Sequence, residues 1–430
     1  MLDRLPVQNG TASPKPSFLK NRTLRGFLHV LGGTATTTAL QGLQFLLLAR
    51  GLGPAEFGRI ATANSVTALL MPFSGLGFAN VMIMRSTRDP RVLPLYLGNA
   101  LGMAVCSGAL LVALSGVAAG AWLQDELPVT LMLVIAVGEL LAAKVIDICW
   151  HVFIAREQLH FTSRVMGFHS AARLTFAAGY VWLNATPTAV GWAWWLLACN
   201  TLVSALILHF TLGIVGRLRA DFAVARSELG MGSSFAVGIS AKGFYTDADK
   251  MFLARFAGAE AVGHYTVAFR VIQIALAPIR ALSFALQARL FRAGEQGIRS
   301  SLRVTIKILV PLSIAALVLA VGFYVTAPLL TIFAGDKYAG SVDVLRTLCL
   351  LPLLLAAQSL MADTLASSGH QRSAAIAEVL AAILVCVLCM TLIPELGWRG
   401  AAIASYASQA TLVLTTVATV VRLTRRKSHA

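Results

Sequence analysis

Residues 48–66 read LARGLGPAEFGRIATANSV, and a shift of 205 positions aligns them with residues 253–271, LARFAGAEAVGHYTVAFRV. Seven of these nineteen positions are identical, and two glycine pairs are among them: Gly53 with Gly258, and Gly58 with Gly263. Each stretch ends one apolar run and enters the next, and the shift is close to half of the 430 residues. The alternative is a chance similarity between two helix ends rich in alanine and leucine. The pattern favours an internal repeat.

The composition around these stretches is that of a membrane protein. Hydrophobic residues make up 57% of the chain and charged residues 13%, against about 45–50% and about 25% in soluble domains. The net charge is +16, but the basic residues stand in short clusters between long apolar runs. We therefore expect no nucleic acid as a partner.

A membrane-spanning helix needs about 20 mostly apolar residues. Reading the chain at that window predicts an all-α polytopic fold with about twelve transmembrane helices. The predicted spans cover residues 27–49, 60–83, 93–123, 128–154, 162–184, 188–213, 230–255, 262–288, 304–330, 343–367, 373–393 and 398–421.

Lysine and arginine test this count, because cytoplasmic connections carry the excess of basic residues. With the N-terminus inside, the cytoplasmic segments hold 23 of them, whereas the outer connections hold five: Arg50, Arg59, Arg255, Lys337 and Arg399. The distribution predicts an even number of spans and two cytoplasmic termini.

Six spans in each half give both halves the same orientation, so the two should be related by a pseudo-two-fold axis along the membrane normal. The expected architecture is two six-helix bundles that face each other across a central cleft. The predicted divisions are a cytoplasmic tail 1–26, an N-terminal bundle 27–213, a cytoplasmic linker 214–229, a C-terminal bundle 230–421 and a basic cytoplasmic tail 422–430.

Three local motifs carry a resemblance to a known family. Residues 48–58 (LARGLGPAEFG) resemble the first-loop signature of bacterial polysaccharide biosynthesis flippases of the Wzx type. Residues 249–255 (DKMFLAR) with 262–265 (VGHY) resemble the seventh helix and its exit, and residues 332–340 (IFAGDKYAG) resemble the segment before the tenth helix. This family belongs to the multidrug/oligosaccharidyl-lipid/polysaccharide (MOP) exporter superfamily, whose fold is MATE-like.

The resemblance implies a transporter, not an enzyme. Its substrate would be an isoprenoid-diphosphate-linked oligosaccharide, moved across a bacterial inner membrane by alternating access for O-antigen (lipopolysaccharide), capsule or exopolysaccharide assembly. The expected partners are this lipid, membrane lipids, and the polysaccharide polymerase and chain-length proteins. We expect no cofactor, no metal and no catalytic residue, with coupling to H⁺ or Na⁺ left open.

Charged residues inside spans are the candidates for the cleft, because a charge facing hydrocarbon costs at least about 2.5–3.5 kcal/mol. In the span 262–288, Arg270, Gln273, Arg280 and Gln287 share one helix face, and arginine can hold phosphate oxygens with two parallel hydrogen bonds. The substrate-binding candidates are Lys242, Arg270, Gln273, Arg280, Arg173 and Gln41. The alternative is that these groups form pairs that hold the bundle together.

A second group of residues is predicted to act in gating or coupling: Asp247, Asp249, Lys250, Asp363 and Glu378. The three-residue spacing of Asp247 and Lys250 permits an ion pair between them. In the fourth span, Lys144 and Asp147 have the same spacing, and there we favour a purely structural pair.

Other functions fit part of the pattern. A cation-coupled multidrug exporter of the MATE type shares the twelve spans, a lipid II flippase typically has fourteen, and a non-transporting scaffold of a polysaccharide synthase needs no charged cleft. The D-x-D of Asp247 and Asp249 occurs in glycosyltransferases, but here it lies within a span. No G-x-x-x-x-G-K-[ST] motif for an ATPase is present in the sequence.

Overall fold

The computed structural model describes residues 17–123, 126–276, 290 and 292–426, and within these ranges the chain is nearly all helical, without a β-strand. The helices are α1 (Ser17–Leu52), α2 (Pro54–Leu70), α3 (Phe78–Arg88), η1 (Pro90–Val92), α4 (Leu93–Trp122), α5 (Val129–Ala136), η2 (Val137–Ala143), α6 (Lys144–Ala155), α7 (Leu159–Leu183), α8 (Ala189–Val215), α9 (Phe222–Ala275), α11 (Ile298–Thr326), α12 (Leu329–Ala334), η3 (Asp336–Tyr338), α13 (Gly340–Leu348), α14 (Leu351–Ser367), α15 (Gln371–Leu396) and α16 (Trp398–Arg426). The predicted all-α polytopic fold is confirmed.

Each of the twelve predicted spans contains helix where the structure describes it. By length and composition, six helices are apolar enough to cross a membrane, and the pair α13–α14, bent by 42°, makes a seventh in the described part of the chain. The other predicted spans fall on α1, α2 with α3, α7 and α9. These helices carry more polar residues, several of which line the cavity described below.

Some boundaries differ from the sequence prediction. α1 begins at Ser17 rather than at residue 27, and α9 begins at Phe222 rather than at 230. The second span is broken at residues 71–77, where Pro72 cannot donate to a helix and Gly77 adopts a left-handed φ of 69°. A Cβ atom on Gly77 would lie 2.2 Å from the carbonyl oxygen of Gly232 in α9, so this close approach requires glycine.

The predicted linker packs on the first half of the chain. The backbone N–H of Asp221 donates to Oδ1 of Asn99 in α4 over 2.9 Å. Nearby, Nε of Arg85 lies 2.8 Å from Oε1 of Glu228, and this hydrogen-bonded carboxylate raises the pKa of Arg85. The start of α9, which the sequence assigns to the linker and the second half, therefore rests on α3 and α4.

The internal repeat reappears as a reciprocal contact between the halves. Gly53 (φ 79°, ψ 172°) precedes α2, and Gly258 (φ 87°, ψ 165°) breaks α9 in the same way. A Cβ on Gly58 would lie 1.7 Å from the carbonyl oxygen of Ala259. A Cβ on Gly263 would lie 2.0 Å from that of Pro54, the equivalent residue of the other half. Such reciprocity is the mark of a two-fold relation, which here relates the two repeats.

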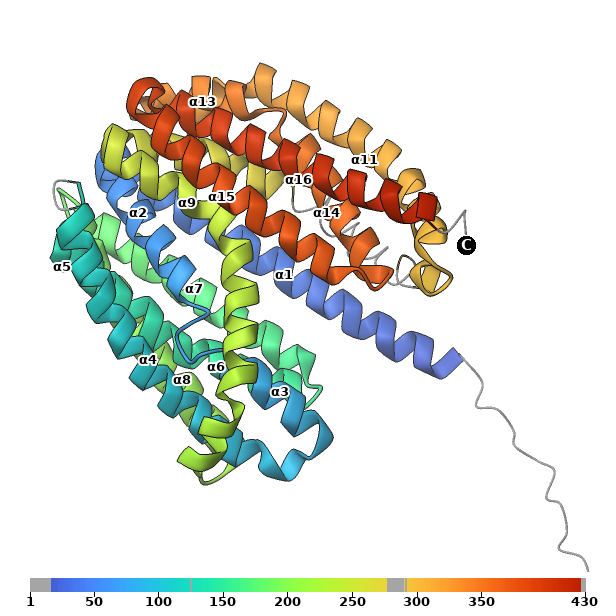
Figure 1. The fold of residues 1–430 in the computed structure, drawn as a ribbon. Helices are drawn as coiled ribbons and strands as arrows, with labels where there is room; N and C mark the ends of the chain where they lie inside the picture. The colour runs from blue at the N-terminus through green and yellow to red at the C-terminus, as the bar shows by residue number, and fades with distance from the viewer. Residues whose placement is uncertain (1–16, 124–125, 277–289, 291, 427–430) are drawn as a thin grey trace, which may run out of the picture.

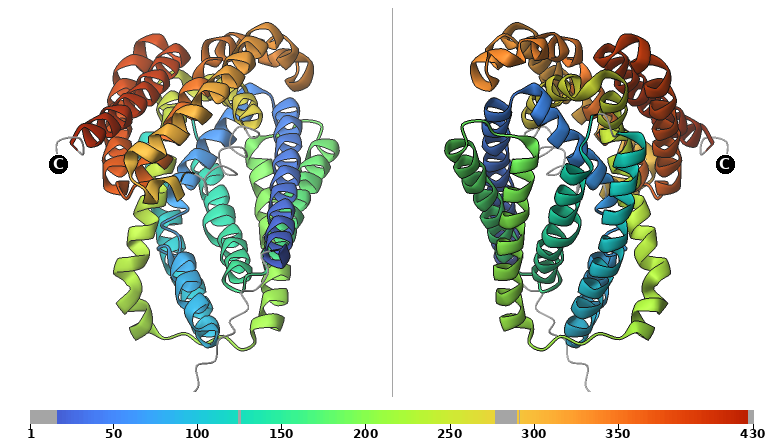
Figure 2. Two further views of the ribbon diagram at one scale, coloured as in Figure 1. Left: turned by 90° about the vertical axis from the view of Figure 1, so that its right-hand side faces the viewer. Right: turned by 90° about the vertical axis from the view of Figure 1, so that its left-hand side faces the viewer.

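The halves approach each other at one end of the molecule. Figure 1 shows them close together near α2, α5 and α13 and diverging toward α3 and the start of α1. In Figure 2 the yellow-to-red helices of the second half lie together above the blue-to-green helices of the first. We call the end where Gly58 meets Gly263 the closed end.

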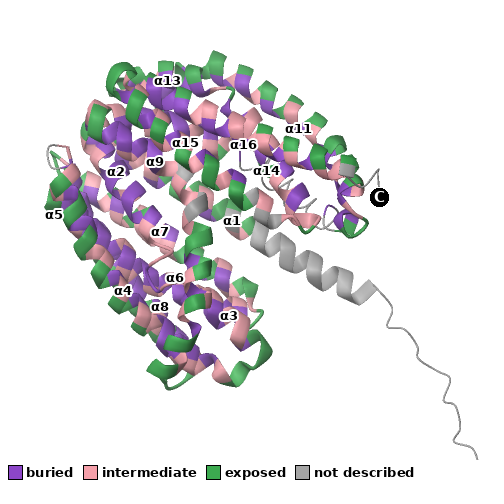
Figure 3. Ribbon diagram, viewed as in Figure 1, coloured by how far each residue is buried: buried purple, intermediate pink, exposed green. Residues whose placement is uncertain are grey.

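Large apolar side chains face outward along the helices. Figure 3 shows exposed residues running along the outer sides of α4 and α11, and these include Leu110, Val117, Ile314 and Val318, each at least 60% exposed. A soluble protein rarely exposes apolar patches of this extent, whereas a bilayer solvates them. The exposed surface therefore agrees with a multi-pass membrane protein.

Candidate functional site

A cavity of about 850 Å³ lies between the two halves. Helices α1, α2, α7 and α8 of the first half and α9, α14 and α16 of the second contribute its walls. Leu48, Phe57 and Trp192 line it near the closed end. The volume lies within the range of sites for small organic ligands.

Arg270 presents a guanidinium group to this cavity from the segment of α9 that follows Gly258. Its Cζ lies 5.6 Å from the ring centre of Phe45 in α1. Its Nε is buried and has no hydrogen-bond partner among the described residues. Gln273 and Gln41 line the same cavity. A cation with a buried donor of this kind can hold an anionic oxygen through a charge-assisted hydrogen bond.

Arg173 of α7 also lines the cavity, but it has an acidic partner. Its Nη2 lies 3.0 Å from Oε1 of Glu139, which stands in the π-helical segment η2. Because π-helical turns widen the helix locally and recur at functional sites, this segment can present Glu139 toward α7. The sequence offered no local partner for Arg173, since Glu139 comes from another helix.

Asp247, Asp249 and Lys250 meet at the cavity wall in α9. Nζ of Lys250 forms an ion pair with Asp247, as their spacing predicts, and lies 4.9 Å from the ring centre of Phe269. Asp249 is 3% exposed, and its Oδ2 accepts a hydrogen bond of 3.3 Å from the hydroxyl of Ser405 in α16. The carboxylate of Asp249 is thus held by a hydroxyl, while the neighbouring carboxylate holds the ammonium group.

The remaining predicted residues lie elsewhere. Asp363 of α14 and Glu378 of α15 are half-buried and are not among the residues that line the cavity. The side chain of Lys242 and the whole of Arg280 lie outside the described residues. The predicted pair of Lys144 and Asp147 is present, with Nζ 2.8 Å from Oδ2, and neither residue is among those that line this cavity.

Several uncharged polar residues of the wall were not predicted as site residues, including Asn64, His169, Thr266, Gln358 and Gln409. Oγ1 of Thr266 and Oε1 of Gln409 are buried without a hydrogen-bond partner in the described ranges. Buried polar atoms are normally paired, so these two are available to a polar ligand. Their signal in the sequence is faint, because a single amide or hydroxyl in an apolar helix has no periodic pattern.

The wall therefore combines cations, amides and hydroxyls with the carboxylates of Asp247 and Asp249, and Asp247 is paired with Lys250. Cations, amides and hydroxyls bind phosphate oxygens and sugar hydroxyls. Within the described residues, no group of three or more histidine, cysteine, aspartate or glutamate side chains is placed to hold a metal ion.

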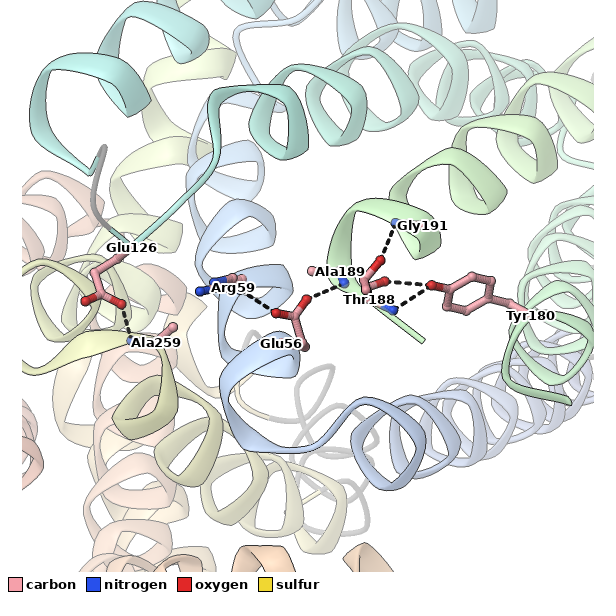
Figure 4. A network of polar contacts seen from close by, with 8 residues as sticks. All are labelled: Glu56, Arg59, Glu126, Tyr180, Thr188, Ala189, Gly191 and Ala259. Carbon is pink, nitrogen blue, oxygen red and sulfur yellow. Dashed lines mark hydrogen bonds and ion pairs between the residues drawn. The ribbon is translucent and has the colours of Figure 1, made fainter. Parts of the chain in front are cut away.

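Two glutamates accept hydrogen bonds from backbone amides at the closed end (Figure 4). Oε2 of Glu56 accepts from the N–H of Ala189 at the start of α8, over 2.6 Å, and Glu56 also pairs with Arg59. Oε2 of Glu126 accepts from the N–H of Ala259 over 3.0 Å. The first contact lies within the first half, whereas the second joins the two halves.

The motif 332–340 packs at this same end. The hydroxyl of Tyr338 donates to the carbonyl oxygen of Ala49, in the motif 48–58, over 3.0 Å. Nδ1 of His264 lies 3.0 Å from the hydroxyl of Ser341. The ring centres of His264 and Tyr338 lie 5.7 Å apart, so parts of all three motifs that carry the family resemblance meet at the closed end.

We expect Glu126→Ala to weaken this closure. The contact is a charge-assisted hydrogen bond at the start of a helical segment, so its loss should shift the balance between closed and open ends by about fivefold, or roughly 1 kcal/mol. Spin labels on Asn184 and Glu260, exposed residues of the two halves, would report a larger population at long distance. Glu395→Ala, an exposed carboxylate of α15, is the control, and equal distance distributions in both variants would contradict the expectation.

Comparison with solved structures shows the same fold in proteins described as transporters. The chain is 16% identical to an inward-facing multidrug resistance MATE family transporter of the MOP superfamily, with a TM-score of 0.73 over 90% of this chain and 96% of the other. An outward-facing MATE transporter of that superfamily is 15% identical, with a TM-score of 0.64 over 94% of this chain and 96% of the other. A MOP superfamily transporter from Pyrococcus furiosus, described as having a binding pocket of reverse polarity, gives 14% and 0.62, covering 94% and 95%.

These likenesses confirm the MATE-like fold predicted from the sequence. No curated protein matches the chain significantly. Residues 47–343, more than half of the chain, match the family described as polysaccharide biosynthesis protein. The matched region begins one residue before the motif 48–58 and includes both glycine pairs of the closed end and much of the cavity wall. The chain has a MATE-like fold and belongs to the polysaccharide biosynthesis protein family.

Proposed function

We propose that this protein is a flippase that moves isoprenoid-diphosphate-linked oligosaccharides across a membrane by alternating access. The observation that carries the proposal is the cavity between the two halves, where Arg270 stands among amide and hydroxyl side chains. The guanidinium suits the diphosphate and the neutral polar groups suit the sugars. Membership in a polysaccharide biosynthesis family supports a saccharide as cargo.

We further propose a bacterial inner membrane as the location, with both termini in the cytoplasm. The five basic residues assigned to the outer connections include Arg50, Arg59, Arg255 and Lys337, and these four flank or belong to closed-end segments. The many other basic connections then belong to the opposite end, as cytoplasmic loops should. The closed end is the outer one in this orientation, and the structure is the state that receives cargo from the cytoplasm.

Energy for net transport would come from a proton or sodium gradient, with Asp249 as the coupling group. A buried carboxylate held by a hydroxyl can take up a proton or a cation without first breaking an ion pair. We expect Asp249→Asn to remove the dependence of transport on an imposed gradient, whereas Asp89→Asn, an exposed carboxylate beyond α3, keeps it. Gradient-driven transport in Asp249→Asn would contradict this role.

The oligosaccharide delivered to the outer leaflet would pass to a polysaccharide polymerase and chain-length proteins, in O-antigen, capsule or exopolysaccharide assembly. The proposal is tested in a strain depleted of this protein. Spheroplasts with intact inner membranes are treated with a membrane-impermeant glycosidase, and the protected lipid-linked oligosaccharide is measured. Accumulation of protected repeat units, reversed by the wild-type chain, supports the proposal. Unchanged exposure of the repeat units contradicts it.

A further inference from the structure

A second, apolar cavity adjoins the first. It has a volume of about 390 Å³ and is lined by residues of α1, α9, α11, α12 and α13. Val271, Ile274, Phe323 and Phe333 are typical of its walls. Ile274 is 38% and Phe333 is 62% exposed, so this cavity opens on the lipid-facing surface of the molecule. We call it the lateral groove.

The groove and the central cavity share two residues, Phe45 and Arg270. The ring of Phe45 lies beside the guanidinium of Arg270 and packs edge-on against Phe57, with 4.8 Å between the ring centres. A polar, charged cavity and an apolar, lipid-facing groove therefore meet at one aromatic ring and one cation.

The groups at this junction suit an amphipathic anion as a ligand. The buried Nε of Arg270 has no partner among the described residues, and leaving a charged donor unsatisfied costs more than it does for a neutral group. A phosphate at the junction would accept a hydrogen bond from Arg270. The sugars attached to that phosphate would lie in the central cavity. An apolar chain attached to that phosphate would enter the groove and leave water, which is favourable by roughly 25 cal/mol per Å² of apolar surface.

We propose that the lateral groove binds the first part of the isoprenoid chain while Arg270 holds the diphosphate of the same molecule. The inference rests on the proposed function and adds a second binding site to it. Phe45 lies seven residues, or about 10 Å, from the end of α1, and the groove also includes Thr326, the last residue of α11. The isoprenoid chain therefore binds in the half of the membrane nearer the closed end, and beyond the groove it extends into lipid.

Binding to the purified full-length chain in phosphatidylcholine nanodiscs tests the groove. The probes are undecaprenyl diphosphate, which has the long chain, and methyl diphosphate, which has none. Leu329→Trp narrows the groove at a side chain that is 47% exposed, and Leu317→Trp is the matched control on the lipid-facing side of α11, 50% exposed and outside the groove.

Wild type should bind undecaprenyl diphosphate more than tenfold tighter than methyl diphosphate. Leu329→Trp should reduce the affinity for undecaprenyl diphosphate at least fivefold and keep the affinity for methyl diphosphate within twofold of wild type. Leu317→Trp should change neither affinity. If both probes bind and the two tryptophan variants have equal affinities for them, the assignment of the groove to the isoprenoid chain is wrong, and the flippase proposal stands. If undecaprenyl diphosphate does not bind wild type, both proposals are wrong.

Two further measurements do not depend on the folding of a variant. A diazirine on the first isoprene unit should label wild type within residues 267–275 or 323–334, and labelling confined to other residues contradicts the proposal. Phosphatidylglycerol added to the nanodiscs should not displace undecaprenyl diphosphate at equal concentration. Equal competition would assign the groove to ordinary membrane lipid and overturn its assignment to the isoprenoid chain.

Discussion

Transport of lipid-linked oligosaccharide is expected to fall about 10- to 100-fold when Arg270 is replaced by alanine. The change removes a charge-assisted interaction worth roughly 1.5–3 kcal/mol, and Arg270 is the cavity cation that forms no ion pair with a described carboxylate. Arg270→Lys should keep part of the activity, because the charge remains while the planar, two-pronged donor is lost. Surface polysaccharide in a complemented deletion strain, normalised to the amount of protein in the membrane, measures the effect.

The control for Arg270 is an arginine that also stacks on an aromatic ring but faces outward. Arg346 lies 5.5 Å from the ring centre of Tyr324 and is exposed. Arg346→Ala should therefore leave surface polysaccharide near the wild-type amount. Normal polysaccharide in Arg270→Ala would contradict the role given to the central cavity and would favour a non-transporting scaffold.

Gly58→Ala is expected to prevent the closed end from forming, with transport reduced more than tenfold. The added Cβ would lie 1.7 Å from the carbonyl oxygen of Ala259, and backbone cannot yield as a flexible side chain does. Spin labels on Asn184 and Glu260, in a cysteine-free background, should report mainly the long distance of an open end. Gly213→Ala in α8, where nothing lies within 4 Å of the new atom, is the control.

Symmetry provides a second test of the same contact. Gly263 is the repeat counterpart of Gly58, and a Cβ added to it would lie 2.0 Å from the carbonyl oxygen of Pro54. Gly263→Ala should therefore open the same end and reduce transport to a similar degree. Short-distance populations in both variants, as in wild type, would show that the reciprocal glycine contact does not control closure.

The sequence was sufficient for the architecture because hydropathy and repetition are local signals. The offset of 205 residues already paired Gly53 with Gly258 and Gly58 with Gly263, and the same pairs make equivalent turns and contacts in the structure. The break at residues 71–77 was missed because its apolar residues preserve the hydropathy of a continuous span. The break depends on the close approach of Gly77 to Gly232, which is a tertiary contact.

The site was less predictable, because a charge in a span does not reveal what it faces. Lys144 and Arg173 look alike in the sequence, yet the first pairs within its own helix and the second reaches the cavity wall and pairs across to Glu139. Glu126 stands in a short connection without any motif, and only the folded chain brings it to Ala259. Packing of the helices determines which side a residue faces and which residue of another helix it pairs with. No local sequence pattern encodes that packing.

Transport by the purified protein in sealed vesicles tests the central claim most directly. Proteoliposomes are loaded with an isoprenoid-diphosphate oligosaccharide that carries a fluorophore on its sugar, and a membrane-impermeant quencher is added outside. We predict that the protected fraction decays in vesicles that contain wild type and decays at least tenfold more slowly with Arg270→Ala. Decay at the same rate in protein-free vesicles, or at an equal rate with both chains, would contradict the account.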